Sequence, residues 1–585
     1  MRLGLLLLAA LATSMILASL APVHASSGSV WYMRIAGDGD DEWSKSILEV
    51  YSEGHLYAYV VGNKWRQPIV AKFDLTTGSV SWVTAVGNRS AGDLGDWPEF
   101  RDVAVCGGKV FVSGYTFKGS PKVLVAAIDA SSGKVLWIRS YGSTSGEVKG
   151  LGVAVDPSCR YLYVVGYEKN AFGTKGRDAV VLKIDASSGE LVKAVVLDFG
   201  GSDYLVDDAL VNGTLYAVGM TDAFDTPGKY YDIVVTALNP DTLAIEKAVV
   251  LGNKGVYEVA AISNYKNSGG AIATDGHAIY VLGQMKSVKK GKTSTLVIAL
   301  DPKTLRVTWS VRVYNASDID VEFYPDQVAV GGRLLYVAGH SWFYPGLWKE
   351  GGFVAVLDKD SGSPVAFYVV RDSELKSGMG IHGVSVVTVG GIDYVAAVSD
   401  YYLPMLRVSI ENKVGQVSVV KYPLKEIDAT SKASEKVVTS SVSVEKVSTE
   451  VSHPSFGKPS NGKSNYLLLL FAEPAKALGV KVVTKTVTST VSITLTRTVV
   501  VTYTTTKLST LTTTVSRVST ITKTTTVPTT VTKVTVSATT VPTTVTSVLT
   551  STVVKSSVPG WVWGVAIALF LVGLGIGVVV GMKRK

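Results

Sequence analysis

The chain has 585 residues, with 57 basic and 48 acidic side chains, a formal net charge of +9 and 47% hydrophobic residues. The positive excess lies near the ends, because residues 26–480 hold 45 basic against 48 acidic residues, a net charge of −3. This balance argues against a nucleic-acid partner, which would need a basic face.

Residues 1–25 have the pattern of a signal peptide. Arg2 precedes the apolar run 3–20, and Val23 and Ala25 are the small residues that a signal peptidase accepts. An uncleaved signal anchor is the alternative, but the run is short and Pro22 follows it. We expect a mature chain that begins near Ser26.

Residues 26–480 carry a repeat. Short Val/Ile/Leu/Tyr-rich runs alternate with Gly, Asn, Asp and Ser clusters, and no segment keeps a 3.6-residue period, which predicts an all-β structure. A strand ending in an acidic or amide residue, followed by three linker residues and then Gly or Leu, recurs every 53 to 62 residues. These acidic or amide positions are Asp74, Asp129, Asp185, Asn239, Asp301, Asp358 and Glu411.

Each interval also contains a second strand that ends in glycine, at Gly62, Gly114, Gly166, Gly219, Gly283 and Gly339. Four strands in a period of this size predict the blades of a β-propeller. The acidic side chain of the repeated phrase is expected to cap the turn between the third and fourth strands, while glycine takes a positive φ there.

The two ends of the repeat region predict how the ring closes. Residues 28–31 resemble the fourth strand of a blade, as in residues 78–82, and residues 466–471 resemble a third strand. Seven complete repeats and one blade shared by the two ends predict eight blades. Seven blades remain the alternative, because residues 426–464 are polar and their strands are poorly marked.

The phrase at residues 128–137, IDASSGKVLW, resembles the repeat of quinoprotein-like propellers of the pyrroloquinoline quinone type, and residues 73–82 and 300–309 resemble it more loosely. The resemblance implies that a tryptophan docks one blade on the next, at Trp82, Trp137 and Trp309. Lys193, Lys247, Ala366 and Val419 stand at the matching places elsewhere, so docking must differ there. The calcium ligands and adjacent cysteine pair of the family's dehydrogenases have no counterpart in this chain, so no quinone cofactor is predicted.

The chain has two cysteines, Cys106 and Cys159, which precede Gly114 and Gly166 by eight and seven residues. Both therefore fall in turns between first and second strands of neighbouring blades. In an exported chain such a pair is a disulfide candidate, and two separate buried thiols are the alternative.

The opposite face of the ring collects aromatic and acidic loop residues. Trp65, Tyr115 and Trp342 follow second strands of three blades, and Asp96 and Glu99 lie in a loop before a first strand. Aromatic faces beside carboxylates suit sugars, peptides or cations, so these five residues form the candidate ligand-binding site. The alternative is that they only pack and solubilise the loops.

The sequence offers little for metal binding or catalysis. Residues 38–42, DGDDE, could hold calcium, but they lack the full EF-hand pattern, and a solvated turn is the simpler interpretation. The six histidines are scattered singly, and no metal spacing follows from them. No Ser/His/Asp order, phosphate loop or paired-carboxylate motif indicates an enzyme.

The C-terminal part predicts display at a cell surface. Residues 481–557 form a Thr/Ser/Val-rich stalk, residues 558–582 an apolar transmembrane helix, and residues 583–585 a basic cytoplasmic tail. Possible N-glycosylation sites begin at Asn88, Asn212 and Asn315. This layout resembles stalked surface proteins of archaea.

We therefore expect a membrane-anchored extracellular propeller that binds a glycan, peptide or protein of the cell envelope. The alternatives are an extracellular enzyme, whether hydrolase, lyase or quinoprotein, and a purely structural spacer. An enzyme should show convergent carboxylates or a metal site in the central funnel, a binder an aromatic surface, and a spacer neither.

Overall fold

The computed structural model describes residues 31–35, 42–64, 67–88, 92–224, 230–260, 270–286, 293–315, 321–343, 351–372, 379–401, 408–412, 417–453, 465–470, 480–481, 498–506, 512–520 and 535–536. Among them no helix has the length and apolar character needed to cross a membrane. The predicted signal peptide, transmembrane segment and tail lie outside the described residues.

The chain divides into two compact units, Met1–Val480 and Lys481–Lys585. In the second unit the antiparallel strands β37 (Thr498–Thr506) and β38 (Thr512–Thr520) pair as a hairpin within the Thr-rich stalk. The short strands β36 (Val480–Lys481) and β39 (Thr535–Val536) complete the C-terminal elements.

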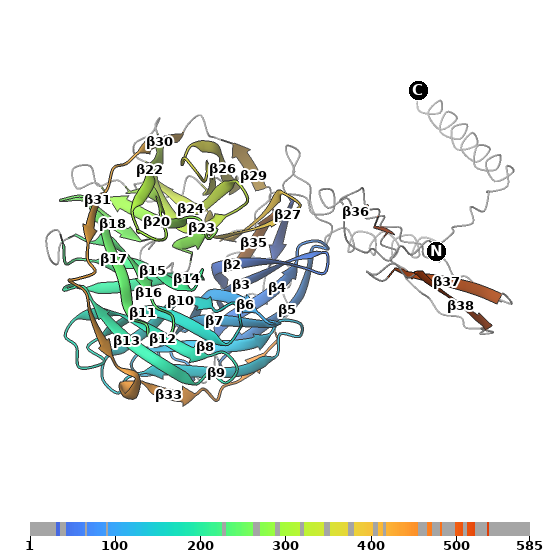
Figure 1. Cartoon of the computed structure of the whole chain (residues 1–585), viewed down its shortest axis with the longest axis horizontal. Helices are drawn as coiled ribbons and strands as arrows, with labels where there is room; N and C mark the ends of the chain where they lie inside the picture. Colours follow the sequence, from blue (N-terminus) through green and yellow to red (C-terminus); the bar gives the residue numbers. More distant parts are fainter. Residues whose placement is uncertain are drawn as a thin grey trace, which may run out of the picture. The chain divides into compact units, whose positions relative to one another are not determined.

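Six antiparallel blades of consecutive strands follow one another around a ring, each beginning with an inner strand near the centre (Figure 1). Blade 1 contains β2 (Glu42–Ser52), β3 (His55–Lys64), β4 (Gln67–Asp74) and β5 (Ser79–Val86), and blade 2 contains β6 (Glu99–Cys106), β7 (Lys109–Thr116), β8 (Lys122–Asp129) and β9 (Val135–Gly142). Blade 3 contains β10 (Glu147–Val155), β11 (Tyr161–Lys169), β12 (Arg177–Asp185) and β13 (Leu191–Asp198), and blade 4 contains β14 (Asp203–Val211), β15 (Thr214–Thr221), β16 (Asp232–Leu238) and β17 (Ile245–Gly252). Blade 5 contains β18 (Tyr257–Ala260), β19 (Ile272–Thr274), β20 (Ile279–Lys286), β21 (Thr293–Leu300) and β22 (Val307–Asn315). In this blade β18 and β19 both pair with β20. Blade 6 contains β23 (Val321–Val330), β24 (Leu334–Phe343), β25 (Gly352–Asp358) and β26 (Pro364–Asp372).

A composite sheet, the closing blade, completes the ring. Its strands are β27 (Met379–Val389), β28 (Ile392–Tyr401), β35 (Asn465–Leu470) and β1 (Trp31–Ile35). The N-terminal strand pairs antiparallel with β35, so that Trp31 lies opposite Leu470 and Ile35 opposite Tyr466. The predicted closure is confirmed over the described residues, because residues 31–35 pair with residues 466–470.

The predicted count of eight blades is wrong. The ring contains six blades of consecutive strands and the composite closing blade. The error lies in the seventh repeat, because Ile410 and Glu411 do not end a third strand. They belong to β29 (Val408–Asn412), which pairs with β26 at the outer edge of blade 6.

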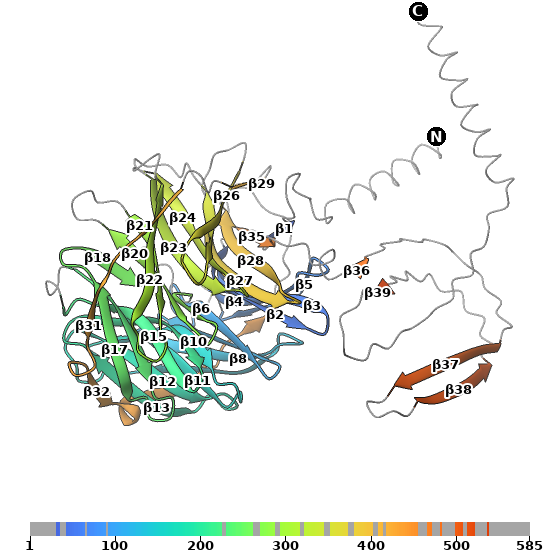
Figure 2. The same cartoon turned by 45° about the horizontal axis from the view of Figure 1, so that its top comes forward.

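Residues 408–412 and 417–452 form a belt that runs back around the outside of the ring (Figures 1 and 2). They add one outer strand to each of blades 6, 5, 4, 3, 2 and 1 in turn, as β29, β30 (Val417–Lys421), β31 (Lys425–Asp428), β32 (Ser434–Val437), β33 (Ser443–Lys446) and β34 (Val451–Ser452), with a short 3₁₀ helix at Thr439–Ser441. The belt occupies the outer edges of the blades, where unpaired backbone groups would otherwise invite edge-to-edge association. Its polar composition, which obscured its strands in the sequence, suits this outer position.

The repeated acidic residue caps its turn as expected. In blade 2 the carboxylate of Asp129 accepts hydrogen bonds from the backbone N–H of Ser131 (3.2 Å) and Ser132 (2.8 Å), while Gly133 has a φ of +73°. Leu243 and Leu305 take the same left-handed conformation in the turns that lack glycine, with φ of +57° and +55°.

The three tryptophans dock neighbouring blades as the resemblance implied. The indole N–H of Trp82 donates to the carbonyl of Ala130 (3.1 Å), that of Trp137 to Ala186 (3.2 Å) and that of Trp309 to Lys359 (3.1 Å). The turn glycine beside each ring leaves it room: a Cβ at Gly133 would lie 2.7 Å from the Trp82 ring. Between blades 3 and 4, which lack the tryptophan, Lys183 reaches Asp241 instead (3.0 Å).

Cys106 and Cys159 form a disulfide between the first turns of blades 2 and 3, with Cα atoms 5.5 Å apart. These turns, together with the capped turns, lie at one end of the blades, which we call the turn face. The opposite end, where second strands end and first strands begin, is the loop face.

We expect deletion of residues 26–36 to abolish cooperative unfolding of the propeller. The deletion removes β1 and leaves β35 as an unpaired edge, so the closing blade loses the partner that joins the two ends of the ring. Thermal melts followed by circular dichroism test this expectation. Deletion of residues 26–29 alone, which keeps β1, is the matched control, and equal melting temperatures for both deletions would contradict the closure.

Candidate functional site at the loop face

The inner strands share an irregularity that places the functional side chains. Six of the described inner strands carry a β-bulge at the same point, where one extra residue interrupts the pairing with the second strand. A bulge redirects the side chain of the extra residue, and bulges often adjoin binding sites. The bulged residues are Lys45, Arg101, Leu151, Val206, Asp326 and His382.

The recurrent glycine of the second strand lies opposite the bulge of the inner strand. A Cβ at Gly114 would lie 1.9 Å from the carbonyl oxygen of Glu99, and a Cβ at Gly339 would lie 2.2 Å from that of Tyr324. Gly166 and Gly219 meet inner-strand carbonyls in the same way, at 1.8 Å and 1.7 Å. The bulged backbone therefore occupies the space that any larger side chain would fill.

In three of these strands the residue after the bulge links neighbouring blades through buried hydrogen bonds. The carboxylate of Asp102 accepts from the backbone N–H of Val153 (2.8 Å), and that of Asp207 from Gly270 (2.7 Å) and Ile272 (2.9 Å). The Gln327 side chain accepts from the N–H of Val384 (3.1 Å). These contacts join blade 2 to 3, blade 4 to 5, and blade 6 to the closing blade.

Two of the five predicted ligand residues, Glu99 and Tyr115, come together with two bulged cations. The Arg101 guanidinium and the Tyr115 hydroxyl both donate to the Glu99 carboxylate, and the Lys45 ammonium lies 3.5 Å from it. Burial opposes ionisation of Glu99, but the charges of Arg101 and Lys45 outweigh it and lower the pKa. Tyr115 is only 7% exposed, so it belongs to the core and differs from the open stacking surface that was expected.

The structure does not bring the other three predicted residues into this cluster as described contacts. Asp96 is exposed in the loop before β6, the side chain of Trp342 lies outside the described residues, and so does the whole of Trp65. Of the sequons, Asn212 is exposed with its amide donating to the carbonyl of Gly276, while the side chain of Asn315 is not described. Asn88 donates to Glu450 of the belt. Most of the candidate calcium segment 38–42 is outside the described residues.

Beside the cluster, Lys149 lies among aromatic rings. Its ammonium is 5.0 Å from the ring centroid of Tyr115, 4.9 Å from that of Phe117 and 5.8 Å from that of Tyr167. Burial is the main cause that lowers the pKa of Lys149, and the nearby charge of Arg101 acts in the same direction. The cation–π contacts partly compensate for the lost hydration.

Four tyrosines continue from this point along the loop face, over blades 3, 4 and 5. We call them the tyrosine arc: Tyr167, Tyr204, Tyr231 and Tyr257. Successive ring centroids are 4.9, 6.0 and 5.9 Å apart in edge-to-face contacts, and every ring is partly exposed. The Arg177 guanidinium lies 5.8 Å from the Tyr204 ring. The arc is thus a partly exposed aromatic surface that includes two cations, Lys149 and Arg177.

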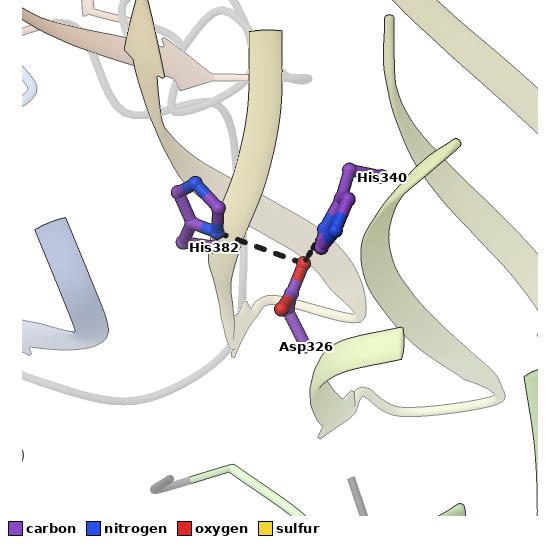
Figure 3. Close-up of side chains that lie close together, drawn as sticks. All are labelled: Asp326, His340 and His382. Atoms are coloured by element: carbon purple, nitrogen blue, oxygen red, sulfur yellow. Dashed lines mark hydrogen bonds and ion pairs between the residues drawn. The ribbon is translucent and has the colours of Figure 1, made fainter. Parts of the chain in front are cut away.

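Across the ring, Asp326, His340 and His382 converge (Figure 3). Nδ1 of His340 is 2.7 Å from Oδ2 of Asp326, and Nδ1 of His382 is 3.7 Å from the same oxygen. Burial of Asp326 favours its neutral form, but the attraction of His340 and contacts with both imidazoles prevail and lower the pKa. This group was not predicted from the sequence, because the histidines are 42 residues apart. Alignment of the inner strands on their bulges would have placed Asp326 and His382 at equivalent positions.

A cluster of carboxylates, Asp178, Asp198 and Asp203, lies between blades 3 and 4 at the same face. Burial and the neighbouring charges of Asp198 and Glu168 raise the pKa of Asp178 to about 7. Burial likewise raises the pKa of Asp203 to about 6, although its Oδ2 accepts from the Phe199 N–H (2.8 Å). Oxygen-only ligands of this kind suit calcium.

Comparison with known proteins finds similarity to solved structures only. No protein-family model matches the chain, and no curated protein sequence matches it significantly. Among solved structures, the chain is similar to the quinohemoprotein alcohol dehydrogenase of Comamonas testosteroni, with 15% identity over 63% of this chain and 72% of that chain and a TM-score of 0.38. A europium-containing methanol dehydrogenase matches with 13% identity over 63% and 84% and a TM-score of 0.34. The β-propeller domain of the trilobed protease from Pyrococcus furiosus matches with 10% identity over 66% and 98% and a TM-score of 0.33.

The carboxylate cluster predicts a pH-dependent stability. Because the folded-state pKa of Asp178 is about 7, above its ordinary value of 3.8, the native state binds the proton more tightly between those pH values. Stability from this group is therefore greatest near pH 4 and falls as the pH rises to 7. We expect Asp178→Asn to raise the melting temperature at pH 8 and to change it little at pH 4.

Melting temperatures measured from pH 4 to 8 with a chelator present check this expectation. Asp360→Asn, which removes one negative charge from an exposed turn, is the control. A melting temperature of Asp178→Asn that is no higher than wild type at pH 8 would show that the carboxylates do not repel one another.

Proposed function

We propose that the propeller binds an acidic glycan of the cell envelope at its loop face. The observation that carries the proposal is the tyrosine arc with Lys149 and Arg177 beside it. Partly exposed aromatic rings offer flat apolar surfaces to the C–H faces of sugars, and the two cations offer partners for carboxylate or sulfate groups.

The cations Lys149 and Arg177 favour an anionic ligand at the part of the arc that adjoins blade 2, whereas the carboxylates of Asp178, Asp198 and Asp203 lie between blades 3 and 4. The charges of Arg101 and Arg177 act on Lys149 as like charges, and Glu147 and Glu99 are the carboxylates that act on it. Glu99 also contacts Lys45 and Arg101 directly, so one carboxylate serves three cations. A ligand that brings its own negative groups would balance these cations.

The proposal includes the setting that the sequence predicts: export, a Thr-rich stalk and a C-terminal membrane anchor, with the propeller outside the cell. The polar belt and the disulfide at the turn face suit such a setting, since disulfides persist in oxidising compartments. An extracellular enzyme is the second candidate, and the observation that favours it is the convergence of Asp326, His340 and His382.

We expect the ectodomain, residues 26–480, to bind immobilised polygalacturonate or dextran sulfate and not neutral dextran. Tyr204→Ala should weaken this binding at least tenfold, because the ring contacts both Tyr167 and Tyr231 in the middle of the arc. Lys149→Gln with Arg177→Gln should abolish most of the binding and reduce its dependence on salt. Biolayer interferometry measures both effects.

The matched control is Arg160→Gln, because Arg160 also packs on a tyrosine, with its guanidinium 4.9 Å from the Tyr161 ring, but at the turn face. It should bind like wild type. Binding that is unchanged in folded Tyr204→Ala and in the Lys149/Arg177 double variant would remove the arc as the site. Preference for the uronate or the sulfate polymer would identify the anionic group that is recognised.

A further inference from the structure

We propose that Asp326, His340 and His382 form a binding site for one divalent transition-metal cation, with Zn²⁺ as the best fit. The two imidazoles and the carboxylate each direct one possible ligand atom to a common region, and these atoms lie within 4.8 Å of one another (Figure 3). The inference goes beyond glycan binding, since it concerns other residues in other blades.

The spacing of the ligand atoms is close to that of a metal centre. Bonds of about 2.0 to 2.2 Å to nitrogen and oxygen place the ligand atoms of a tetrahedral or octahedral ion about 3.0 to 3.5 Å apart. The two distances from Oδ2 of Asp326, 2.7 Å and 3.7 Å, lie on either side of this range. Side-chain movements of less than about 1 Å would therefore accommodate the ion.

The buried carboxylate gives an independent reason for a cation. The side chain of Asp326 has no exposed surface, and its Oδ1 has no hydrogen-bond partner among the described residues. A buried carboxylate oxygen without a partner is costly, because it has lost its hydration without replacement. A cation held by Asp326 and the two imidazoles would partly compensate this carboxylate for its lost hydration.

The surrounding structure holds the ligands in place. Asp326 and His382 are the bulged residues of adjacent inner strands, and His340 lies on the second strand of blade 6. The Tyr324 ring stacks on His340 with centroids 5.3 Å apart and an interplanar angle of 11°. Gly380 leaves space for His382, since a Cβ there would lie 2.5 Å from its imidazole. Ligands fixed in this way lose little freedom when a metal binds.

The chemistry of the three ligands selects the type of ion. Two imidazole nitrogens and one carboxylate suit zinc and its first-row neighbours, whereas calcium and magnesium prefer oxygen ligands alone. Three protein ligands leave at least one coordination position for water or for an anionic group of a ligand. The carboxylates at Asp178, Asp198 and Asp203, in contrast, offer oxygen only.

The test is a Zn²⁺ titration of the metal-stripped full-length chain against a chromophoric chelator at pH 7.5, with no glycan present. We expect one equivalent to bind tightly in wild type, and His382→Gln and His340→Gln each to weaken binding at least 100-fold. Co²⁺ in place of Zn²⁺ should give visible absorption bands that both variants lose. Melting temperatures measured with chelator establish that the variants are folded, and the second variant serves if the first does not fold.

His55→Gln is the matched control. Nδ1 of His55 lies 2.9 Å from Oδ2 of Asp74, so this variant removes a histidine–aspartate pair that has no third ligand in the described residues. It should leave Zn²⁺ binding unchanged. Wild-type protein that binds no Zn²⁺, or binding that survives in both His variants and is lost in Asp178→Asn, would overturn the proposal. Neither outcome bears on glycan binding by the arc.

Discussion

The structure depends on one backbone contact that is repeated around the ring. In blades 2, 3, 4 and 6 the carbonyl of a bulged inner strand lies where the Cβ of the facing residue would be, and only glycine leaves it room. In the six described inner strands that carry it, the bulge turns one side chain away from the regular alternation, and in two pairs of adjacent blades these side chains meet. The glycine that marks the repeat in the sequence is therefore a requirement of the functional face as well as of the blade.

Two groups of side chains result from this repeated contact. The bulged residues Lys45 and Arg101 meet around Glu99 in blades 1 and 2, and Asp326 and His382 meet beside His340 in blade 6 and the closing blade. In blades 2, 4 and 6 the residue after the bulge, Asp102, Asp207 or Gln327, hydrogen-bonds to the next blade and holds the inner strands in register. The closing blade contributes to the histidine–aspartate group and to the hydrogen bonds between blades, because His382 and the Val384 N–H belong to its inner strand. Loss of the N-terminal strand would thus affect the site as well as the ring.

The sequence revealed the period, the capped turns, the docking tryptophans and the closure, because each of these depends on residues close together in the chain or on a repeated phrase. The prediction was wrong for a segment that lies outside the repeat. Ile410 and Glu411 resemble the end of a third strand in sequence, but they belong to the first strand of the belt. The outer strands of the belt need no apolar pattern. In the candidate site, Glu99 and Tyr115 were named but their burial was not foreseen, since Glu99 begins a strand after a polar loop and Tyr115 lies near the end of a strand before another loop. The histidine–aspartate group was not predicted, because its members come from three strands. The bulges that bring them together are recognised only once the strand pairing is known.

The most direct test of the bulge account is the change in unfolding free energy on Gly339→Ala, compared with Gly332→Ala. A Cβ at Gly339 would lie 2.2 Å from the Tyr324 carbonyl oxygen and 2.5 Å from the Phe353 ring, whereas at Gly332 the nearest atom is 3.4 Å away. Urea unfolding should show Gly339→Ala to be less stable than wild type by about 1 to 3 kcal/mol or more. Gly332→Ala should stay within about 0.5 kcal/mol of wild type. Equal stability of the two variants would contradict the claim that the bulged carbonyl requires glycine opposite it.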